Sequence, residues 1–249
     1  MRSRFLTRFF FICLVAVLAS LAPASFAATP LTQIQVQACR ATSSLLLLQG
    51  EGFQKAHIAR LERDLQALDS AMQSVPQPSD EMRANHLELV TQLRRGVSFG
   101  ANPDDVPWRY PEVLSKALRD FLSVARSQQS EQNQGQVPAM VEYLAVQYLS
   151  RAYIGSFEIA REQPKTYIGQ DERMLVPAVD SALAALGAKT DPAISKLSVR
   201  WKYLKSALND MNSQSSALIS ISGRPFAPIT VDRHTRAFSK HWMALKADQ

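Results

Sequence analysis

The spacing of apolar residues is the feature of this 249-residue sequence that most restricts its fold. In several long stretches, apolar side chains recur at alternating intervals of four and three residues, which places them along one side of an α-helix. Most of the thirteen prolines lie between these stretches, where helices are expected to stop. Only residues 219–222 alternate as a strand does, and they lie at an expected helix end. The pattern therefore predicts an all-α protein.

Six to seven helices are expected from this spacing and from the residues that begin helices. Ser79 and Asp191 are suited to the N-cap position, and Pro111 is suited to the first helical position. Short connections between long helices predict an elongated antiparallel bundle of the up-down type. The expected helices cover residues 32–74, 79–95, 111–127, 138–161, 177–186, 192–222 and 231–246.

The first expected helix contains a break, because the phase of its apolar seam shifts after Gly50 and Gly52. We interpret the two glycines as a kink or as a place where a neighbour packs closely. If unbroken, this helix has about 42 residues and a length of roughly 60 Å. It is then long enough to pack against the helix at 192–222 throughout. We therefore favour one domain over residues 28–249, although the Gln-rich stretch 128–136 is a possible joint between two sub-bundles.

The first 27 residues have the layout of a cleavable secretory signal peptide. Three arginines precede an apolar run at residues 9–22, and Ser25 and Ala27 are small residues at the −3 and −1 positions of a cut after Ala27. The run has 14 residues, whereas a spanning helix needs roughly 20, so an uncleaved anchor is the less favoured alternative. No later segment is long and apolar enough to span a membrane. We therefore expect an exported protein, periplasmic in a Gram-negative bacterium and otherwise secreted.

Removal of this leader changes the charge and the cysteine content of the chain. It takes away three arginines and leaves 25 basic against 22 acidic residues. A mild excess spread along the chain is not the footprint of a nucleic-acid-binding protein, so that class of partner is excluded. Cys39 is then the only cysteine, which excludes an intramolecular disulfide. It is either buried or paired between subunits, and burial is favoured because Ile34 and Ala38 lie beside it in the pattern.

The sequence contains no motif that indicates catalysis, a cofactor or a metal. G-x-S-x-G, Walker and H-E-x-x-H patterns are all absent. His234 and His241 are separated by about 10 Å along a helix, which is too far for both to bind one ion. His86 lies on an apolar seam, and we expect a hydrogen-bonded core histidine there. The acidic pairs 104–105 and 171–172 are neighbours in loops, which does not indicate an acid–base pair across a cleft.

Three loops contain residues suited to binding. Trp108 and Tyr110 flank an arginine, a combination that suits stacking or carboxylate recognition. The favoured alternative is that the two aromatic residues close the end of the bundle. Tyr167 and Arg224 stand in weaker combinations of the same kind. The candidate residues for a ligand or a partner are Trp108, Arg109, Tyr110, Tyr167 and Arg224.

The last expected helix is basic on one side and apolar on the other. Arg233, Arg236 and Lys240 lie opposite Phe238 and Trp242. Such a helix can contact an anionic membrane or an acidic partner. The favoured interpretation is that the apolar side completes the bundle core and the basic residues face water.

Taken together, these patterns favour an exported, non-catalytic binding or interaction protein that is an accessory of the cell envelope. One alternative is a periplasmic protein of the small-ligand-binding or sensory type, with its site between helices or under the Trp108 loop. The architecture is similar to the four-helix sensory bundles of bacterial receptors, which is a likeness of fold only. The other alternative is an enzyme with an unrecognised site between helices. It requires a buried polar cleft that joins a histidine to carboxylates from separate helices.

Overall fold

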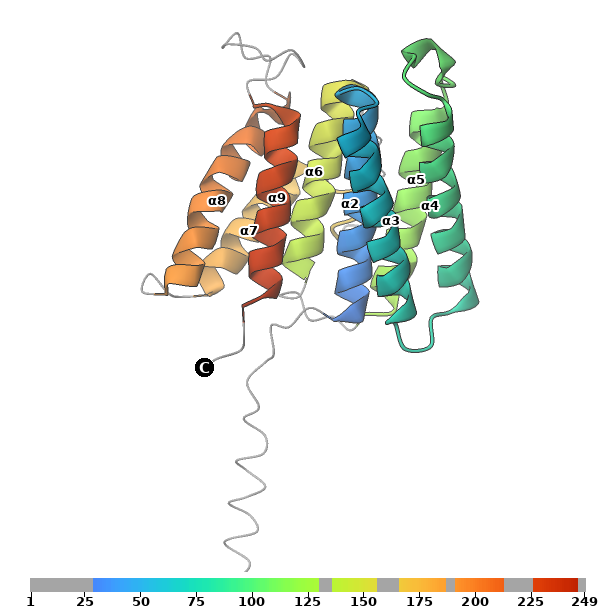
Figure 1. The fold of residues 1–249 in the computed structure, drawn as a ribbon. Coiled ribbons are helices and arrows are strands. Elements are labelled where there is room, and N and C mark those ends of the chain that lie inside the picture. Colours follow the sequence, from blue (N-terminus) through green and yellow to red (C-terminus); the bar gives the residue numbers. More distant parts are fainter. Residues whose placement is uncertain (1–28, 130–135, 156–165, 187–190, 213–225, 246–249) are drawn as a thin grey trace, which may run out of the picture.

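The structure, a computed structural model, describes residues 29–129, 136–155, 166–186, 191–212 and 226–245. Within these ranges it contains eight α-helices and no strand, so the all-α prediction is confirmed. The expected signal peptide at residues 1–27 lies outside the described ranges. The helices are α2 (Pro30–Gly50), α3 (Lys55–Gln73), α4 (Asp80–Ser98), α5 (Tyr110–Ser127), α6 (Val137–Tyr153), α7 (Glu172–Ala185), α8 (Pro192–Asn209) and α9 (Pro228–Met243), with 3-10 turns at Pro103–Asp105 and Asp210–Asn212 (Figure 1).

The helices lie side by side as a bundle, with α2 and α6 at its centre (Figure 1). Helices α4 and α5 lie on one side of this pair, and α7 and α8 lie on the other. Helix α2 packs against α3, α4, α5, α6 and α9. Among the described helices, none combines the length and the apolar character that crossing a membrane requires.

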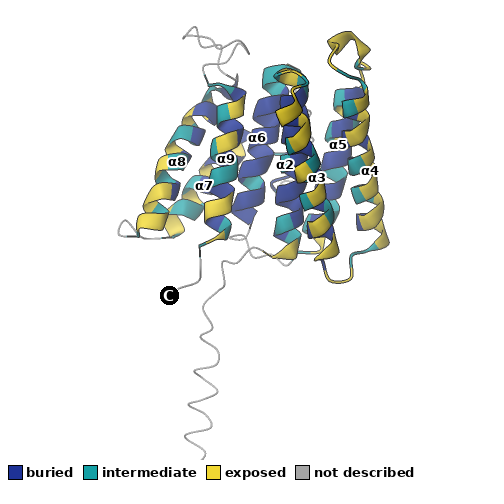
Figure 2. Ribbon diagram, viewed as in Figure 1, coloured by how far each residue is buried: buried dark blue, intermediate teal, exposed yellow. Residues whose placement is uncertain are grey.

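The central position of α2 and α6 follows from their composition. The four consecutive leucines at residues 45–48 point to different sides of α2, and all four are buried. Nearly every residue from Val137 to Ser150 in α6 is also buried (Figure 2). Helix α5, by contrast, buries a single stripe that includes Leu114, Leu118 and Phe121. A helix that is apolar on all sides must be surrounded, whereas a one-sided helix belongs at the surface.

The expected first helix at residues 32–74 is in fact two helices, α2 and α3, joined by a turn. Gly52 in this turn has a φ of +91°, a left-handed conformation that a right-handed helix cannot contain. The kink that we offered as one interpretation is therefore a reversal of the chain, whereas the close approach of a neighbour is confirmed at Gly50, where the Tyr153 ring packs. Helix α2 is only about 30 Å long. The expected pairing with the helix at 192–222 is also wrong, because α8 packs against α7 and α9.

The N-caps expected from the sequence are present, but two helices begin clearly earlier than expected. One is α9, which begins at Pro228 and not at Val231. The side chains of Ser79 and Asp191 accept hydrogen bonds from the first turns of α4 and α8, as predicted. Helix α7, however, begins at Glu172 and not at Pro177. Asp171 caps this helix by accepting from the Arg173 backbone N–H, and Pro177 lies inside it on the exposed side.

Three arginines and three carboxylates form a buried network where α2, α3, α6 and α9 meet. Arg236 donates from Nε to Asp232 Oδ1 at 3.0 Å and from Nη1 to Asp64 Oδ1 at 3.0 Å. Arg40 donates from Nε to Glu142 Oε1 at 2.7 Å. The network comprises Arg40, Arg60, Arg236, Asp64, Glu142 and Asp232, with Arg60 also donating to Asp232.

The network is electrically balanced, and two of its three carboxylates are fully buried. The side chains of Glu142 and Asp232 are 0% exposed, so each requires a cationic partner. Burial alone would lower the pKa of Arg236, but the Asp232 and Asp64 carboxylates raise it above its ordinary value. Arg236 therefore does not face water as expected from the helix pattern, and only Arg233 and Lys240 of that basic group are exposed. The reason is that α9 packs against both α6 and α2, so more than its apolar stripe is buried.

Replacing Asp232 by asparagine tests how much this network contributes to the stability of the protein. Asp232→Asn is expected to lower the free energy of unfolding by about 3 kcal/mol, because Arg60 and Arg236 lose a buried carboxylate. The matched control is Asp120→Asn, which removes an exposed pair with Lys116 and is expected to cost at most about 0.5 kcal/mol. Urea unfolding followed by circular dichroism measures both. Equal losses would contradict the prediction.

Candidate functional site

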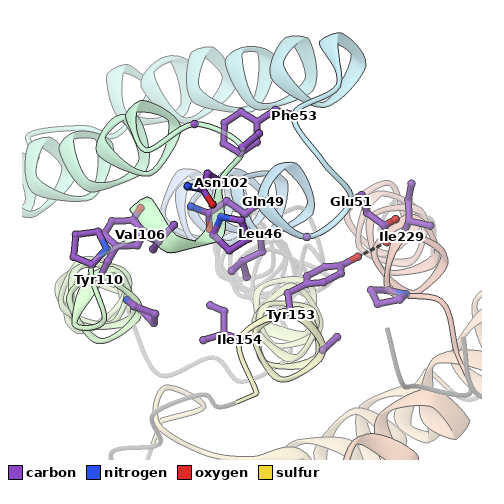
Figure 3. Close-up of a pocket in the computed structure, with 18 of the residues that line it drawn as sticks. Leu46, Gln49, Glu51, Phe53, Asn102, Val106, Tyr110, Tyr153, Ile154 and Ile229 are labelled. Carbon is purple, nitrogen blue, oxygen red and sulfur yellow. Dashed lines mark hydrogen bonds between the residues drawn. The ribbon is translucent and has the colours of Figure 1, made fainter. Parts of the chain in front are cut away.

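A pocket of about 940 Å³ opens at one end of the bundle, where four segments of the chain meet. These segments are the turn between α2 and α3, the loop between α4 and α5, the end of α6 and the start of α9 (Figure 3). Aliphatic and aromatic side chains form most of its surface. They include Leu46, Phe53, Val106, Tyr110, Tyr153 and Ile154.

The loop between α4 and α5 is shaped by local hydrogen bonds. Gly100 has a φ of +74° and turns the chain away from α4. The Asn102 side chain accepts from the Asp104 backbone N–H at 3.3 Å and begins the 3-10 turn. The Val106 N–H then donates to the Pro103 carbonyl at 3.2 Å. This conformation places Val106 in the pocket lining.

Tyr110 forms one wall of the pocket and is held rigidly. Its hydroxyl donates to the Gln92 carbonyl at 2.7 Å, and its ring packs edge-on against Phe99. Close approach to α4 is allowed by Gly96, where a Cβ atom would lie 2.3 Å from the Tyr110 Oη atom. Burial raises the pKa of Tyr110 above its ordinary value, so this side chain stays neutral.

Tyr153 and Glu51 form a hydrogen-bonded pair in the pocket. The Tyr153 hydroxyl donates to Glu51 Oε1, and its ring lies over Gly50, where a Cβ atom would be 2.2 Å from Tyr153 Cδ1. Burial, followed by the hydrogen bond to Glu51 and its charge, raises the pKa of Tyr153. In Figure 3, Glu51 and Ile229 lie at one end of the pocket and Val106 at the other, with Tyr153 between them.

Of the five residues predicted from the sequence, two line this pocket and a third stacks on one of these two. Trp108 and Tyr110 line it, and the Arg109 guanidinium stacks on the Trp108 ring at 4.7 Å from the ring centroid. Tyr110 closes the bundle end, as the favoured alternative holds, but Trp108 does not because it is 81% exposed. Its indole lies on the rim of the pocket.

The other two predicted residues are not part of the pocket as described. Tyr167 is a buried core residue whose hydroxyl donates to Gln35 Oε1 at 2.7 Å and whose ring packs edge-on against Tyr143. Burial raises its pKa well above the ordinary value. Arg224 lies outside the described residues. Tyr167 therefore contributes to packing between α2 and α6, at a distance from the pocket lining.

Several lining residues were not found by sequence reasoning. Glu51 was assigned to the interior of a long kinked helix, which hid its place at a chain reversal. Tyr153 and Ile154 were assigned to a helix reaching residue 161, whereas α6 ends at Tyr153 and Gly155 has a φ of +87°. The glycines are the one local signal in the sequence for these two helix ends: Gly50 and Gly52 mark the end of α2, and Gly155 marks the end of α6.

The described residues do not assemble a recognisable catalytic centre. They contain no group of three His, Cys, Asp or Glu side chains that could hold a metal ion. Carboxylates from separate helices do meet in the buried network, but arginines pair with them and no histidine joins them. His86 lies against Asp69 and the Phe121 ring, and burial lowers its pKa although Asp69 opposes this. Cys39 is buried, as favoured from the sequence.

Comparison with known proteins adds no assignment to this site. No family model, no curated protein and no solved structure matches the chain. The candidate site is therefore defined by its own geometry, which is an apolar pocket with one acidic end and an exposed tryptophan on its rim.

The contact between Gly50 and Tyr153 predicts an unusual response to a small substitution. Alanine normally stabilises a helix relative to glycine, but Gly50→Ala is expected to cost about 1–3 kcal/mol because its methyl group collides with the Tyr153 ring. The loss should disappear when Gly50→Ala is made in a Tyr153→Ala background. A double-mutant cycle by urea unfolding measures this coupling. An equal loss of stability in both backgrounds would show that the cost of Gly50→Ala does not come from a collision with the Tyr153 ring.

Proposed function

We propose that this chain is an exported, non-catalytic binding protein that holds a small, largely apolar ligand in the pocket beneath the Trp108 loop. The observation that carries the proposal is the pocket itself, which is built from four segments and lies next to the aromatic loop. Its volume of about 940 Å³ falls in the range of small-molecule sites, roughly 300–1,000 Å³.

The character of the lining supports binding of an apolar body. Leu46, Val106 and Ile154 supply aliphatic surface, and burial of apolar surface contributes roughly 25 cal/mol per Å². Tyr110 and Tyr153 are held by hydrogen bonds within the protein. Binding therefore orders few side chains, which lowers its entropic cost.

The exposed Trp108 supports a second candidate, in which the bound group belongs to a protein of the cell envelope. Tryptophan and arginine are the residues most enriched among those that dominate protein interfaces. Trp108 is 81% exposed and carries the Arg109 guanidinium on its ring. A side chain of such a partner would enter the same pocket, so this accessory role uses the same site.

A neutral fluorescent probe tests the pocket directly. N-phenyl-1-naphthylamine is expected to bind the purified protein saturably with a rise in emission, because it is apolar and aromatic. Val106→Trp is expected to weaken binding at least tenfold, since the indole would occupy the pocket. The control is Val199→Trp on α8, because Val199 is 65% exposed and no described residue of α8 lines the pocket.

Two outcomes of this titration would contradict the proposal. One is an absence of saturable binding by wild-type protein whose circular dichroism shows a folded helical state. The other is equal weakening by Val106→Trp and Val199→Trp, which would place the probe outside the pocket.

Export is part of the same proposal and rests on the sequence of residues 1–27. Expression of the full chain is expected to give an exported protein that begins at Ala28. Intact-mass measurement of the exported fraction tests this, with N-terminal sequencing as the control. Residues before Ala28 in that fraction would show that the leader remains attached as an anchor.

A further inference from the structure

The described pocket lining carries a negative charge and no positive charge. Glu51 is the one charged residue among the described residues that line the pocket. The nearest arginine in the loop, Arg109, stacks on Trp108 and is not part of the lining. A ligand that enters this pocket therefore meets a carboxylate without a cationic neighbour in the described lining.

The Glu51 carboxylate has capacity for a further partner. Its Oε1 atom accepts from the Tyr153 hydroxyl, while its Oε2 atom accepts no hydrogen bond from the described residues. A buried or half-buried carboxylate oxygen is most favourably satisfied by a charged donor. The turn between α2 and α3 holds Glu51 at one end of the pocket (Figure 3).

Aromatic rings along the pocket also attract positive charge. Phe53, Tyr110 and Tyr153 line it, and the Trp108 indole lies on its rim. The faces of these rings carry negative electrostatic potential and attract ammonium groups. The hydroxyls of both tyrosines donate to protein acceptors, so they offer ring surface more than donors to a ligand.

We infer, on the basis of the proposed binding function, that the ligand is an organic cation with an apolar body. Its ammonium group lies at Glu51 beside the Tyr153 ring. Its body extends past Leu46 toward Val106 under the Trp108 loop. Organic anions are disfavoured, because they would bring a second negative charge next to Glu51 without a compensating cation in the described lining.

Three probes of one size separate charge from shape. They are 4-phenylbutylamine, 4-phenylbutanol and 5-phenylpentanoate, which share a phenyl ring with a chain of four methylene groups and differ in the charge of the end group at neutral pH. Isothermal titration of the mature protein is expected to give at least tenfold tighter binding of the amine than of the alcohol. The carboxylate is expected to bind most weakly.

A substitution at Glu51 tests the assigned partner. Glu51→Gln keeps an acceptor for the Tyr153 hydroxyl but removes the charge, so the ratio of amine to alcohol affinity is expected to fall to near one. The control is Glu62→Gln, which removes a half-exposed carboxylate on α3 that is not part of the pocket lining and is expected to leave that ratio unchanged.

The outcomes distinguish this inference from the proposed function. Equal affinity of wild-type protein for all three probes would overturn the cation preference. The pocket would then bind apolar groups irrespective of their charge. Retention of the preference in Glu51→Gln would overturn the role of Glu51. Binding of none of the three probes, nor of N-phenyl-1-naphthylamine, would contradict the proposed function itself.

Discussion

Helix α2 is buried on every side, and this burial determines where the other helices lie. Its four consecutive leucines face different directions, so neighbours are needed all around it. It also buries polar side chains, which require partners inside the protein. Gln35, for example, accepts from Tyr167 and donates to the Leu31 carbonyl. Such fixed polar contacts select one arrangement of the surrounding helices, which apolar packing alone does less strictly.

The buried charges also fix the position of α9 and, through α9, the position of one wall of the pocket. Arg236 pairs with Asp64 on α3, Asp232 pairs with Arg60 on the same helix, and Ser239 on α9 donates to Glu142 on α6. Asp232 follows Pro228 and Ile229 by about one helical turn, and both of these residues line the pocket. The network therefore positions one wall of the pocket, although no network residue is part of its lining. The stability of the protein and the geometry of the pocket are therefore linked through α9.

Local sequence patterns predicted the fold class and many helix boundaries, because those features depend on neighbouring residues. Apolar spacing identifies helices, and Ser79 and Asp191 form N-caps through their own first turns. The chain reversal at Gly52 was missed because α2 and α3 carry the same apolar rhythm on both sides of it. Arg236 was placed in water because a helix pattern shows one apolar stripe and does not reveal a second neighbour. Both errors concern tertiary contacts, which periodicity does not encode.

In the candidate site, too, the sequence predicted what neighbouring residues determine and missed what tertiary contacts determine. The composition of the loop drew attention to Trp108, Arg109 and Tyr110, which the structure brings together at the pocket. The pairing of Glu51 with Tyr153 joins residues 102 positions apart, and no local pattern indicates it. Its geometry nevertheless depends on a short-range feature, the absence of a side chain at Gly50. With the tyrosine hydroxyls engaged in the protein, Glu51 is the one charged residue of the described pocket lining, and the proposed preference for a cation rests on this carboxylate set against apolar walls.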